Sequence, residues 1–438
     1  MSKSIPHVFS NRNISFHIIP FTMLIHTGAW YRIPMVLSMS VIGIAAEYNP
    51  FHNGHFYHIS ESKRAVPGAK VIAVMSGSFT QRGDPAICDK YTRTRMALEN
   101  GVDIVAELPA FYAVSSAEYF AGAAVRLMNA AGVVTHISFG TESGGLDEIR
   151  LAAGALHTRG EAVNQMTRKF MSEGLPYFTA REKSLSGILR ISMDFIRQPN
   201  NILAVEYMKT LSETQSAIIP MTVRRSGAGY HETASALRRC VMANDYPALA
   251  EYMPESAFFL LLRHISQYGS ADISRLGSIL FYLLRAKPAD EIRAILDMND
   301  GVAERMLRMC GQHDTITGLL DAVKTKRYAY ARLKRAAAHL LLDMRKDTFD
   351  TLNRSGGPRY IRILGFRKDA ARLLGEMTER ASLPVITDLK KAGGVLDEQG
   401  AVMLNMDIKA ADVYYLACGN IKNTHGINHE YHRGIIVV

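Results

Sequence analysis

Short apolar runs recur through the first half of the chain and restrict its fold more than any other pattern. They occupy residues 41–46, 71–75, 102–106, 133–138 and, after a longer interval, 217–223. The first four follow one another about every thirty residues, which is the length of a strand, a helix and the next parallel strand. Nearly continuous apolar strands are typical of sheets that helices cover on both faces. The pattern therefore predicts a doubly wound α/β fold with a parallel sheet.

The spacing of the apolar runs also predicts how the chain divides into domains. The interval before the fifth run has helical periodicity and predicts a helical insertion near residues 145–195. Beyond the fifth run the pattern is helical again, until a Gly-Gly-Pro break at 356–358 precedes a β-prone run at 360–364. We expect an α/β domain over residues 39–245 and a mainly α-helical C-terminal region over residues 246–438.

Residues 1–38 differ from the rest of the chain. They contain the only tryptophan, Trp30, and a mixed run over residues 14–25 that polar residues and a proline interrupt. A signal peptide requires a clean apolar centre and a small-residue cleavage site, and neither is present. We interpret this segment as an N-terminal extension outside the core, with Met39 or Met35 as the natural start.

Charge and cysteine content indicate which partners and which cellular compartment suit this chain. Lys and Arg total 51 against 41 acidic residues, and the resulting net charge of +10 favours a polyanionic partner. The four cysteines are scattered without a CxxC pair: Cys88, Cys240, Cys310 and Cys418. That spacing argues against a zinc site or a disulfide framework and fits a reducing cytoplasm. The chain has no uncharged apolar stretch of about 18 residues, so we expect no membrane span.

The most informative motif is Glu-Tyr-Asn-Pro-Phe-His-Asn-Gly-His at residues 47–55, where the first predicted strand meets the first predicted helix. Ligands of open parallel sheets bind at the carboxyl ends of the strands, and a helix N-terminus there attracts phosphate. His52 and His55 would supply donors for the charge that develops during an in-line displacement at phosphorus. Gly54 would let a nucleotide ring approach closely. The alternative is two loop histidines, one of which caps the helix.

Two stretches carry a resemblance to a known family. AEYNPFHNGH at residues 46–55, followed by MSGSFTQRGDPA at 75–86, resembles the bacterial tRNA(Met) cytidine acetate ligases of the HIGH-type nucleotidyltransferase superfamily. The similarity runs from about residue 40 to the C-terminus. It implies a Rossmann-like (HUP) fold and an enzyme that makes acetyl-adenylate from ATP and acetate, with Mg²⁺ bound by phosphate and water. It further implies transfer of the acetyl group to N4 of the wobble cytidine of elongator tRNA(Met).

The resemblance also assigns site residues, with His52 and His55 as the catalytic pair that faces the phosphates. The matching ATP-binding segment comprises Ala45, Ala46, Glu47, Tyr48, Asn49, Pro50, Phe51, His52, Asn53, Gly54, His55, Phe56, Tyr57 and His58. Further ATP-binding positions match Gly140, Asn200 and Arg225. Judged by residue type alone, Gly140 is an ordinary turn glycine and Asn200 a helix N-cap.

Two more blocks extend the predicted site. Ser235 and Arg238 resemble a helix start that grips the β- and γ-phosphates in related nucleotidyltransferases, and Arg224 is an additional candidate for such a contact. The block departs from the KMSKS signature of class I aminoacyl-tRNA synthetases, which argues against a synthetase. Gln81 and Arg82 lie in a long loop after the second predicted strand, and we expect them near the acetate or the cytidine.

The most basic segment covers residues 324–335, and an apolar stripe at helical spacing over residues 329–344 predicts that one helix face packs. Lys326, Lys334 and Arg335 would then project outward beside a tyrosine and contact tRNA, because cations interleaved with aromatic rings suit phosphates and exposed bases. A solvated helix face is the alternative. Arginines at residues 354–367 extend the basic excess and favour an RNA surface.

Three other questions remain open at the level of sequence. Lys90, Arg93 and Arg95 begin a predicted helix and either face substrate or solvate the surface. A nucleotide-cofactor adenylyltransferase of the same fold would share the HxGH block, although it usually has no large basic helical half. A noncatalytic RNA-binding protein on this scaffold would not need both histidines. Nothing in the sequence indicates an obligate protein partner.

Overall fold

The computed structural model describes seven stretches of the chain. They are residues 39–142, 145–175, 177–189, 198–224, 234–326, 328–420 and 426–438. Residues 40–438 form one compact unit. The prediction for residues 1–38 and the assignment of Arg225 both fall outside the described residues.

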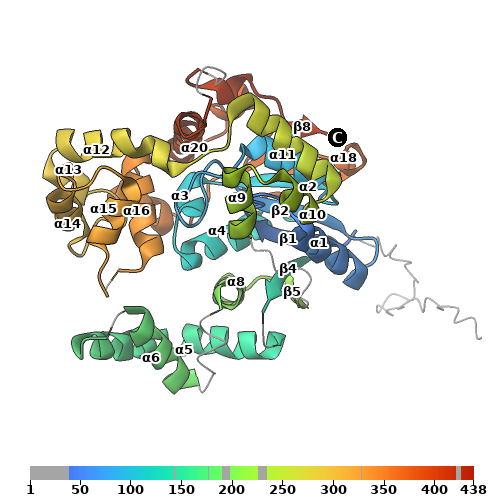
Figure 1. Cartoon of the computed structure of the whole chain (residues 1–438). Helices are drawn as coiled ribbons and strands as arrows, with labels where there is room; N and C mark the ends of the chain where they lie inside the picture. The colour runs from blue at the N-terminus through green and yellow to red at the C-terminus, as the bar shows by residue number, and fades with distance from the viewer. Residues whose placement is uncertain are drawn as a thin grey trace, which may run out of the picture. The chain divides into compact units, whose positions relative to one another are not determined.

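The predicted doubly wound fold is confirmed by five parallel strands in the first half of the chain (Figure 1). The strands are β1 (Val41–Ala46), β2 (Lys70–Ser76), β3 (Ile104–Leu108), β4 (His136–Thr141) and β5 (Ile219–Arg224). Their order in the sheet is β5-β4-β1-β2-β3. The chain therefore proceeds outward from β1 to β3 and then returns to the other side of β1. This reversal between β1 and β4 is the position at which open α/β sheets bind ligands.

Helices connect these strands and include the predicted insertion. The helices of this half are α1 (Asn53–Ala65), α2 (Lys90–Glu99), α3 (Ala110–Ala113), α4 (Ala117–Ala130), α5 (Leu146–Ser172), α6 (Tyr177–Leu189), α8 (Pro199–Glu213) and α9 (Ala234–Ala243). The insertion consists of α5 and α6, which pack on each other in the lower part of Figure 1, and α8 returns the chain to β4.

The second half is mainly helical, as predicted. Its helices are α10 (Tyr246–Glu251), α11 (Glu255–Tyr268), η1 (Ile273–Leu276), α12 (Gly277–Ala286), α13 (Ala289–Arg293), α14 (Val302–Met309), α15 (Ile316–Val323), α16 (Tyr330–Leu342), α17 (Lys346–Arg354), η2 (Lys368–Ala370), α18 (Ala371–Arg380), α19 (Leu389–Ala392), α20 (Glu398–Leu416) and η4 (His429–His432). Within α16, the apolar stripe predicted for residues 329–344 belongs to the buried face of the helix.

The sheet continues into this second half, which the sequence pattern does not reveal. The β-prone run at 360–364 becomes β6 (Ile361–Phe366), which pairs antiparallel with β3. Two short strands, β7 (Val385–Ile386) and β8 (Ile436–Val437), pair with β6. The sheet is therefore mixed at this edge, and residues 246–438 complete the same sheet that residues 39–245 begin. The paired residues of β3 and β6 are more than 250 positions apart, and hydrophobic periodicity within a short window of sequence does not indicate such distant pairing.

Apolar packing explains why β1, β2 and β3 lie at the centre of the sheet. Ile42 and Val71 have no exposed surface, and the neighbouring strand residues are nearly as well covered. The β1 and β2 registers align Ala46 with Met75, so both strands end at the same level. The loops that follow them consequently start side by side at one edge of the sheet.

Candidate active site

The loop from β1 to α1 carries the HxGH motif. His52 is the N-cap of α1, with an extended backbone and with Nδ1 accepting a hydrogen bond from the Gly54 N–H at 3.1 Å. The His55 Nδ1 accepts in turn from the His52 N–H at 3.3 Å. The two interpretations of the motif are thus compatible, because His52 caps the helix and also lies at the carboxyl edge of the sheet.

These hydrogen bonds determine how the two imidazoles are protonated. A ring nitrogen that accepts from an N–H carries no proton, so a neutral ring holds its proton on Nε2. We therefore assign the Nε2–H tautomer to His52 and His55. Their rings stack with centroids 3.7 Å apart and planes 25° apart, so each ring limits the movement of the other. The pair offers two N–H donors at a helix N-terminus, as a phosphate that gains charge requires.

Aromatic residues support this pair from the side of the core. Tyr48 and Phe51 are buried, and the Tyr48 ring meets the His55 ring edge-on at 4.9 Å. At Gly54, a Cβ atom would lie 2.9 Å from Cε1 of His52. Glycine is therefore required here by the neighbouring imidazole itself, while close approach of a nucleotide to Gly54 stays a prediction.

A tight hairpin follows β2 and lies against this loop. Phe79 and Pro85 form an antiparallel bridge across its base. Near its tip, the Gln81 N–H donates to Oε1 of Glu47 at 2.6 Å. Arg82, the next residue, is exposed. The segment that the sequence suggests for acetate or cytidine is thus tied directly to the HxGH loop.

Two buried polar side chains hold both loops in place. Arg93 has no exposed surface and donates to the carbonyl oxygens of Glu47 at 2.7 Å and Ser76 at 3.0 Å. Asn49 is also buried, and its Oδ1 accepts from the Ile87 N–H at 2.7 Å. The suggestion that Arg93 solvates the surface is therefore wrong. Its guanidinium occupies the space between the ends of β1 and β2, where several carbonyl oxygens converge.

The carboxyl of Glu47 lies among cations at the same edge. Burial raises the pKa of Glu47, and the hydrogen bond from the Gln81 N–H opposes that shift. Three guanidinium groups oppose it as well, those of Arg238, Arg93 and Arg82. The region therefore has more positive than negative charge, which favours a polyanionic ligand.

The predicted phosphate-binding helix reaches this edge. Arg238 of α9 donates through Nη1 to the Asn49 carbonyl at 2.9 Å and through Nη2 to Oγ of Ser235 at 3.0 Å. Burial lowers the pKa of Arg238, and the carboxylates of Asp84 and Glu47 oppose the shift. The structure thus brings together three blocks that are far apart in the sequence: the HxGH loop, the hairpin and the start of α9.

The end of β4 contributes another part of the edge. Gly140 lies on β4, next to β1. Asn200 donates from Nδ2 to Oε1 of Glu142, just beyond this strand. The N-cap of α8 is Gln198, so the interpretation of Asn200 as an N-cap is wrong. Its amide instead fixes the loop after β4.

Two more predicted residues lie on the elements around this edge. The His58 Nε2 and the Ser138 Oγ are 2.9 Å apart, which joins α1 to β4. Arg224 is the exposed last residue of β5. Both positions are compatible with nucleotide contacts, which stay predictions.

Comparisons with known proteins agree with this geometry. The family model described as HIGH Nucleotidyl Transferase matches residues 39–428. A tRNA(Met) cytidine acetate ligase of Halothermothrix orenii is 34% identical over 401 residues, which cover 86% of this chain and 95% of that protein. One from Clostridium perfringens is 35% identical over 411 residues, covering 90% of this chain and 98% of its own length. The chain belongs to the tRNA(Met) cytidine acetate ligase family.

A solved structure of this family has the same fold. The crystal structure of Thermotoga maritima TmcAL bound with alpha-thio ATP matches with a TM-score of 0.86 and 29% sequence identity. The match covers 91% of this chain and all of the Thermotoga chain. The apo crystal structure of the same Thermotoga protein matches equally well.

In this member of the cytidine acetate ligase family, α16 does not present its cations as predicted. Lys334 pairs with Asp84 of the hairpin, and Nε of Arg335 lies 3.0 Å from Oδ2 of Asp297. The prediction that both side chains project freely outward is therefore wrong. Lys326, just before the helix, is exposed. Helical spacing correctly identifies the polar face of α16, but that face meets carboxylates from other parts of the chain.

A second prediction is wrong for Arg362 of β6, which is almost fully buried and does not belong to an RNA surface. Lys90 of α2 is also almost fully buried, so the suggestion that it solvates the surface is wrong. Lys90 lies 2.7 Å from Oε1 of Glu107 and 2.6 Å from Oε2 of Glu430. Arg362 contacts the same two carboxylates at 2.9 and 2.6 Å. Of Lys90, Arg93 and Arg95, only Arg95 is on the surface, where its Nη1 lies 4.0 Å from Oε1 of Glu99.

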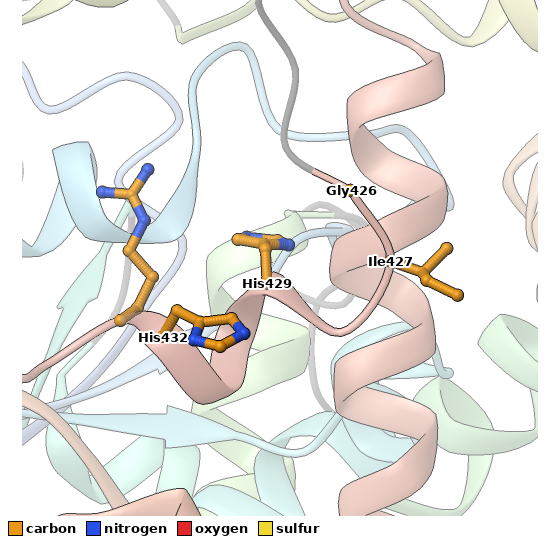
Figure 2. Close-up of a pocket in the computed structure, with 5 residues that line it drawn as sticks. Gly426, Ile427, His429 and His432 are labelled. Atoms are coloured by element: carbon orange, nitrogen blue, oxygen red, sulfur yellow. The ribbon is translucent and has the colours of Figure 1, made fainter.

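One cavity among the described residues shares no lining residue with the HxGH edge. It measures about 350 Å³ and is lined by Gly426, Ile427, His429, His432 and Arg433 (Figure 2). His429 contacts Asp412 at 3.3 Å, and burial lowers its pKa. None of the residues assigned to ATP lines this cavity, so the motif and the cavity point to different places. We place the candidate active site at the HxGH motif rather than at this cavity. Of the two places, only the motif combines N–H donors, a helix N-terminus and an excess of positive charge.

The remaining sequence predictions concern disulfides, membrane spans and metal sites. All four cysteines are free. No helix in the described parts of the chain is long and apolar enough to cross a membrane. The described residues also contain no group of three His, Cys, Asp or Glu side chains arranged to hold a metal ion.

Proposed function

We propose that this protein is an ATP-dependent ligase that forms acetyl-adenylate and transfers the acetyl group to N4 of the wobble cytidine of elongator tRNA(Met). The observation that carries the proposal is the stacked pair of His52 and His55 at the N-terminus of α1. The names of the relatives supply the ligase activity and the tRNA substrate. The Thermotoga structure with an ATP analogue supports ATP as the nucleotide.

In the first step, an acetate oxygen attacks the α-phosphorus of ATP and the bond to the β-phosphate breaks, so that pyrophosphate leaves. The Nε2–H groups of His52 and His55 donate to the phosphate oxygens as charge accumulates on them. Arg238 and Arg82 offset the charge of the leaving group. His52, His55 and Arg238 are already oriented by hydrogen bonds and packing, so little reorganisation of these donors is needed during the reaction.

In the second step, the N4 amine of cytidine attacks the acetyl carbonyl of the mixed anhydride, loses a proton and displaces AMP. We place the acetyl group and the cytidine near Gln81 and Arg82, because the Gln81 backbone is held beside the HxGH loop. The exposure of Arg82 leaves it accessible to an incoming RNA strand.

Mg²⁺ fits this site as an ion that arrives with ATP. It retains several water ligands and often binds through substrate phosphates rather than through a cage of side chains. The residues near the HxGH loop suit that mode, because cations outnumber Glu47 and Asp84 there. The ion would offset charge on the phosphates.

The tRNA would approach a protein of net charge +10. Of the three cations proposed for this contact, Lys326 remains the best candidate because it is exposed, while Lys334 and Arg335 are paired with carboxylates. We propose the cytoplasm as the compartment, where ATP, acetate and tRNA are all present.

Exchange of labelled pyrophosphate into ATP tests the first step. We expect exchange that requires acetate and proceeds without tRNA, because adenylate formation is reversible. A panel of other carboxylates should support less exchange than acetate. Exchange that ignores acetate and requires a mononucleotide would instead identify a cofactor adenylyltransferase.

A further inference from the structure

The hairpin after β2 rests on α16, a helix from the other half of the chain. Gly83 at its tip has a φ of +87°, and a Cβ atom there would lie 2.8 Å from the carbonyl carbon of Lys334. The next residue, Asp84, accepts a hydrogen bond from Nζ of Lys334. The two side chains are 25% and 24% exposed, so solvent only partly screens the pair. A backbone contact and an ion pair therefore join the hairpin to α16.

Asp84 also lies within the electrostatic reach of Arg238. Its carboxylate is the charged group that most strongly opposes the effect of burial on the Arg238 pKa. Among the described residues, however, Asp84 forms its only ion pair with Lys334. Arg238 forms no ion pair with any residue that the structure describes, and it donates hydrogen bonds to the neutral oxygens of Asn49 and Ser235. One carboxylate thus acts electrostatically on Arg238 and forms its ion pair with Lys334, the cation outside the site.

We infer that Lys334 is a positioning residue of the active site: it holds the Asp84 carboxylate away from Arg238, so that the Arg238 guanidinium remains available to the phosphates of ATP. This inference rests on the proposed function, because it assumes that Arg238 binds the nucleotide. It assigns to α16 a role in ATP binding in place of the direct tRNA contact that the sequence suggests. Without Lys334, the Asp84 carboxylate is free to turn toward Arg238, pair with its guanidinium and compete with the phosphates.

Binding of ATP to the whole protein, measured by calorimetry without acetate or tRNA, tests this role in three variants. Lys334→Met should raise the Kd for ATP about tenfold, which corresponds to about 1.4 kcal/mol. Asp84→Asn should remain within about threefold of wild type, because it removes the competing carboxylate together with the pair. The double variant Asp84→Asn/Lys334→Met should bind like Asp84→Asn. A merely structural ion pair gives no such recovery.

Lys287→Met is the matched control. Lys287 is 22% exposed and lies 3.2 Å from Asp343 at the end of α16, so its removal breaks a similar pair away from the site. It should leave the Kd unchanged. If Lys334→Met does not fold, Lys334→Gln replaces it, with the same expected direction. The inference would be overturned if the folded Lys334 variant bound ATP with wild-type affinity. It would also be overturned if the double variant bound ATP as weakly as the Lys334 single variant. ATP binding without acetate-dependent exchange in the wild type would refute the proposed function, while the variants still decide the role of Lys334.

Discussion

The carboxyl ends of β1 and β3 both collect cations, but they balance the charge differently. At β3, Lys90 and Arg362 share two carboxylates, Glu107 and Glu430, and all four side chains are buried. At β1, Arg238 hydrogen-bonds only to neutral oxygens within the described residues, and two imidazole N–H donors lie at a helix N-terminus. The charges at β3 are paired with one another, whereas cations outnumber carboxylates at β1, which favours an anionic ligand there. The position at a sheet edge is therefore not sufficient for a binding site; the unbalanced charge is what distinguishes β1.

The largest expected effect is on stability and belongs to the β3 region. Arg362→Met removes one of the two cations from a buried ionic group, so that Lys90 alone faces the carboxylates of Glu107 and Glu430. We expect a loss of about 3–5 kcal/mol in the free energy of unfolding, measured by urea denaturation. The Kd for ATP, measured well below the melting temperature, should stay at the wild-type value. A large change in ATP affinity would break the distinction between the two regions.

The next effect is on catalysis and belongs to the β1 region. His55→Ala should slow acetate-dependent pyrophosphate exchange about 10²–10³-fold, because it removes one oriented donor to the phosphate. The melting temperature should change little, since His55 lies in the first turn of α1 and is only partly buried. His432→Ala is the control, because His432 lines the separate cavity in Figure 2. Normal exchange in His55→Ala, or a large loss in His432→Ala, would move the active site away from β1.

A smaller effect on ATP affinity should follow from Arg238→Met. Hydrogen bonds to charged groups contribute about 1.5–3 kcal/mol, so ATP binding should weaken by about that amount. The same variant should weaken pyrophosphate binding, since the contact that we propose for Arg238 is with the leaving group. Equal affinities for ATP in the variant and in the wild type would remove Arg238 from the site.

The smallest effect is a difference in pH dependence. Burial alone would raise the pKa of Glu430, but Lys90 and Arg362 outweigh it and lower that pKa from 4.5 to about 2. The group therefore stabilises the folded chain above about pH 4.5, and this contribution is lost as the pH falls toward 2. Urea midpoints of the wild type should decline across this interval. Glu430→Gln should be less stable at pH 7 but should show a shallower decline; a parallel decline would mean that other carboxyls control acid stability.

Local sequence patterns were sufficient for the parts of the fold that local interactions specify. The apolar runs indicated the five parallel strands, and the position of His52 and His55 after the first run indicated the edge where they lie. The runs at 102–106 and 133–138 became β3 and β4 with a shift of two or three residues at their ends. Such boundaries depend on pairing with neighbouring strands, which a single run does not contain.

Apart from the N-cap assignment of Asn200, the errors concern charged side chains whose partners are distant in the sequence. Arg362 meets Glu107 across 255 positions of the chain, and Lys334 meets Asp84 across 250 positions. Periodicity identifies which helix face is polar, but whether that face contacts solvent or carboxylates depends on tertiary structure. Arg93 was missed for the same reason, because its acceptors are backbone oxygens at two strand ends. The residues next to Arg93 in the sequence do not distinguish a buried arginine from one on the surface.

Transfer of labelled acetate to tRNA tests the central claim most directly. The full chain is incubated with ATP, labelled acetate and purified elongator tRNA(Met), and the nucleosides are analysed after digestion. We predict ATP-dependent incorporation of acetate as N4-acetylcytidine, at the wobble position only, with little product in the His55→Ala variant. Absence of acetylated cytidine with the wild-type protein, or equal incorporation by His55→Ala, would contradict the assignment of this activity to the carboxyl end of β1.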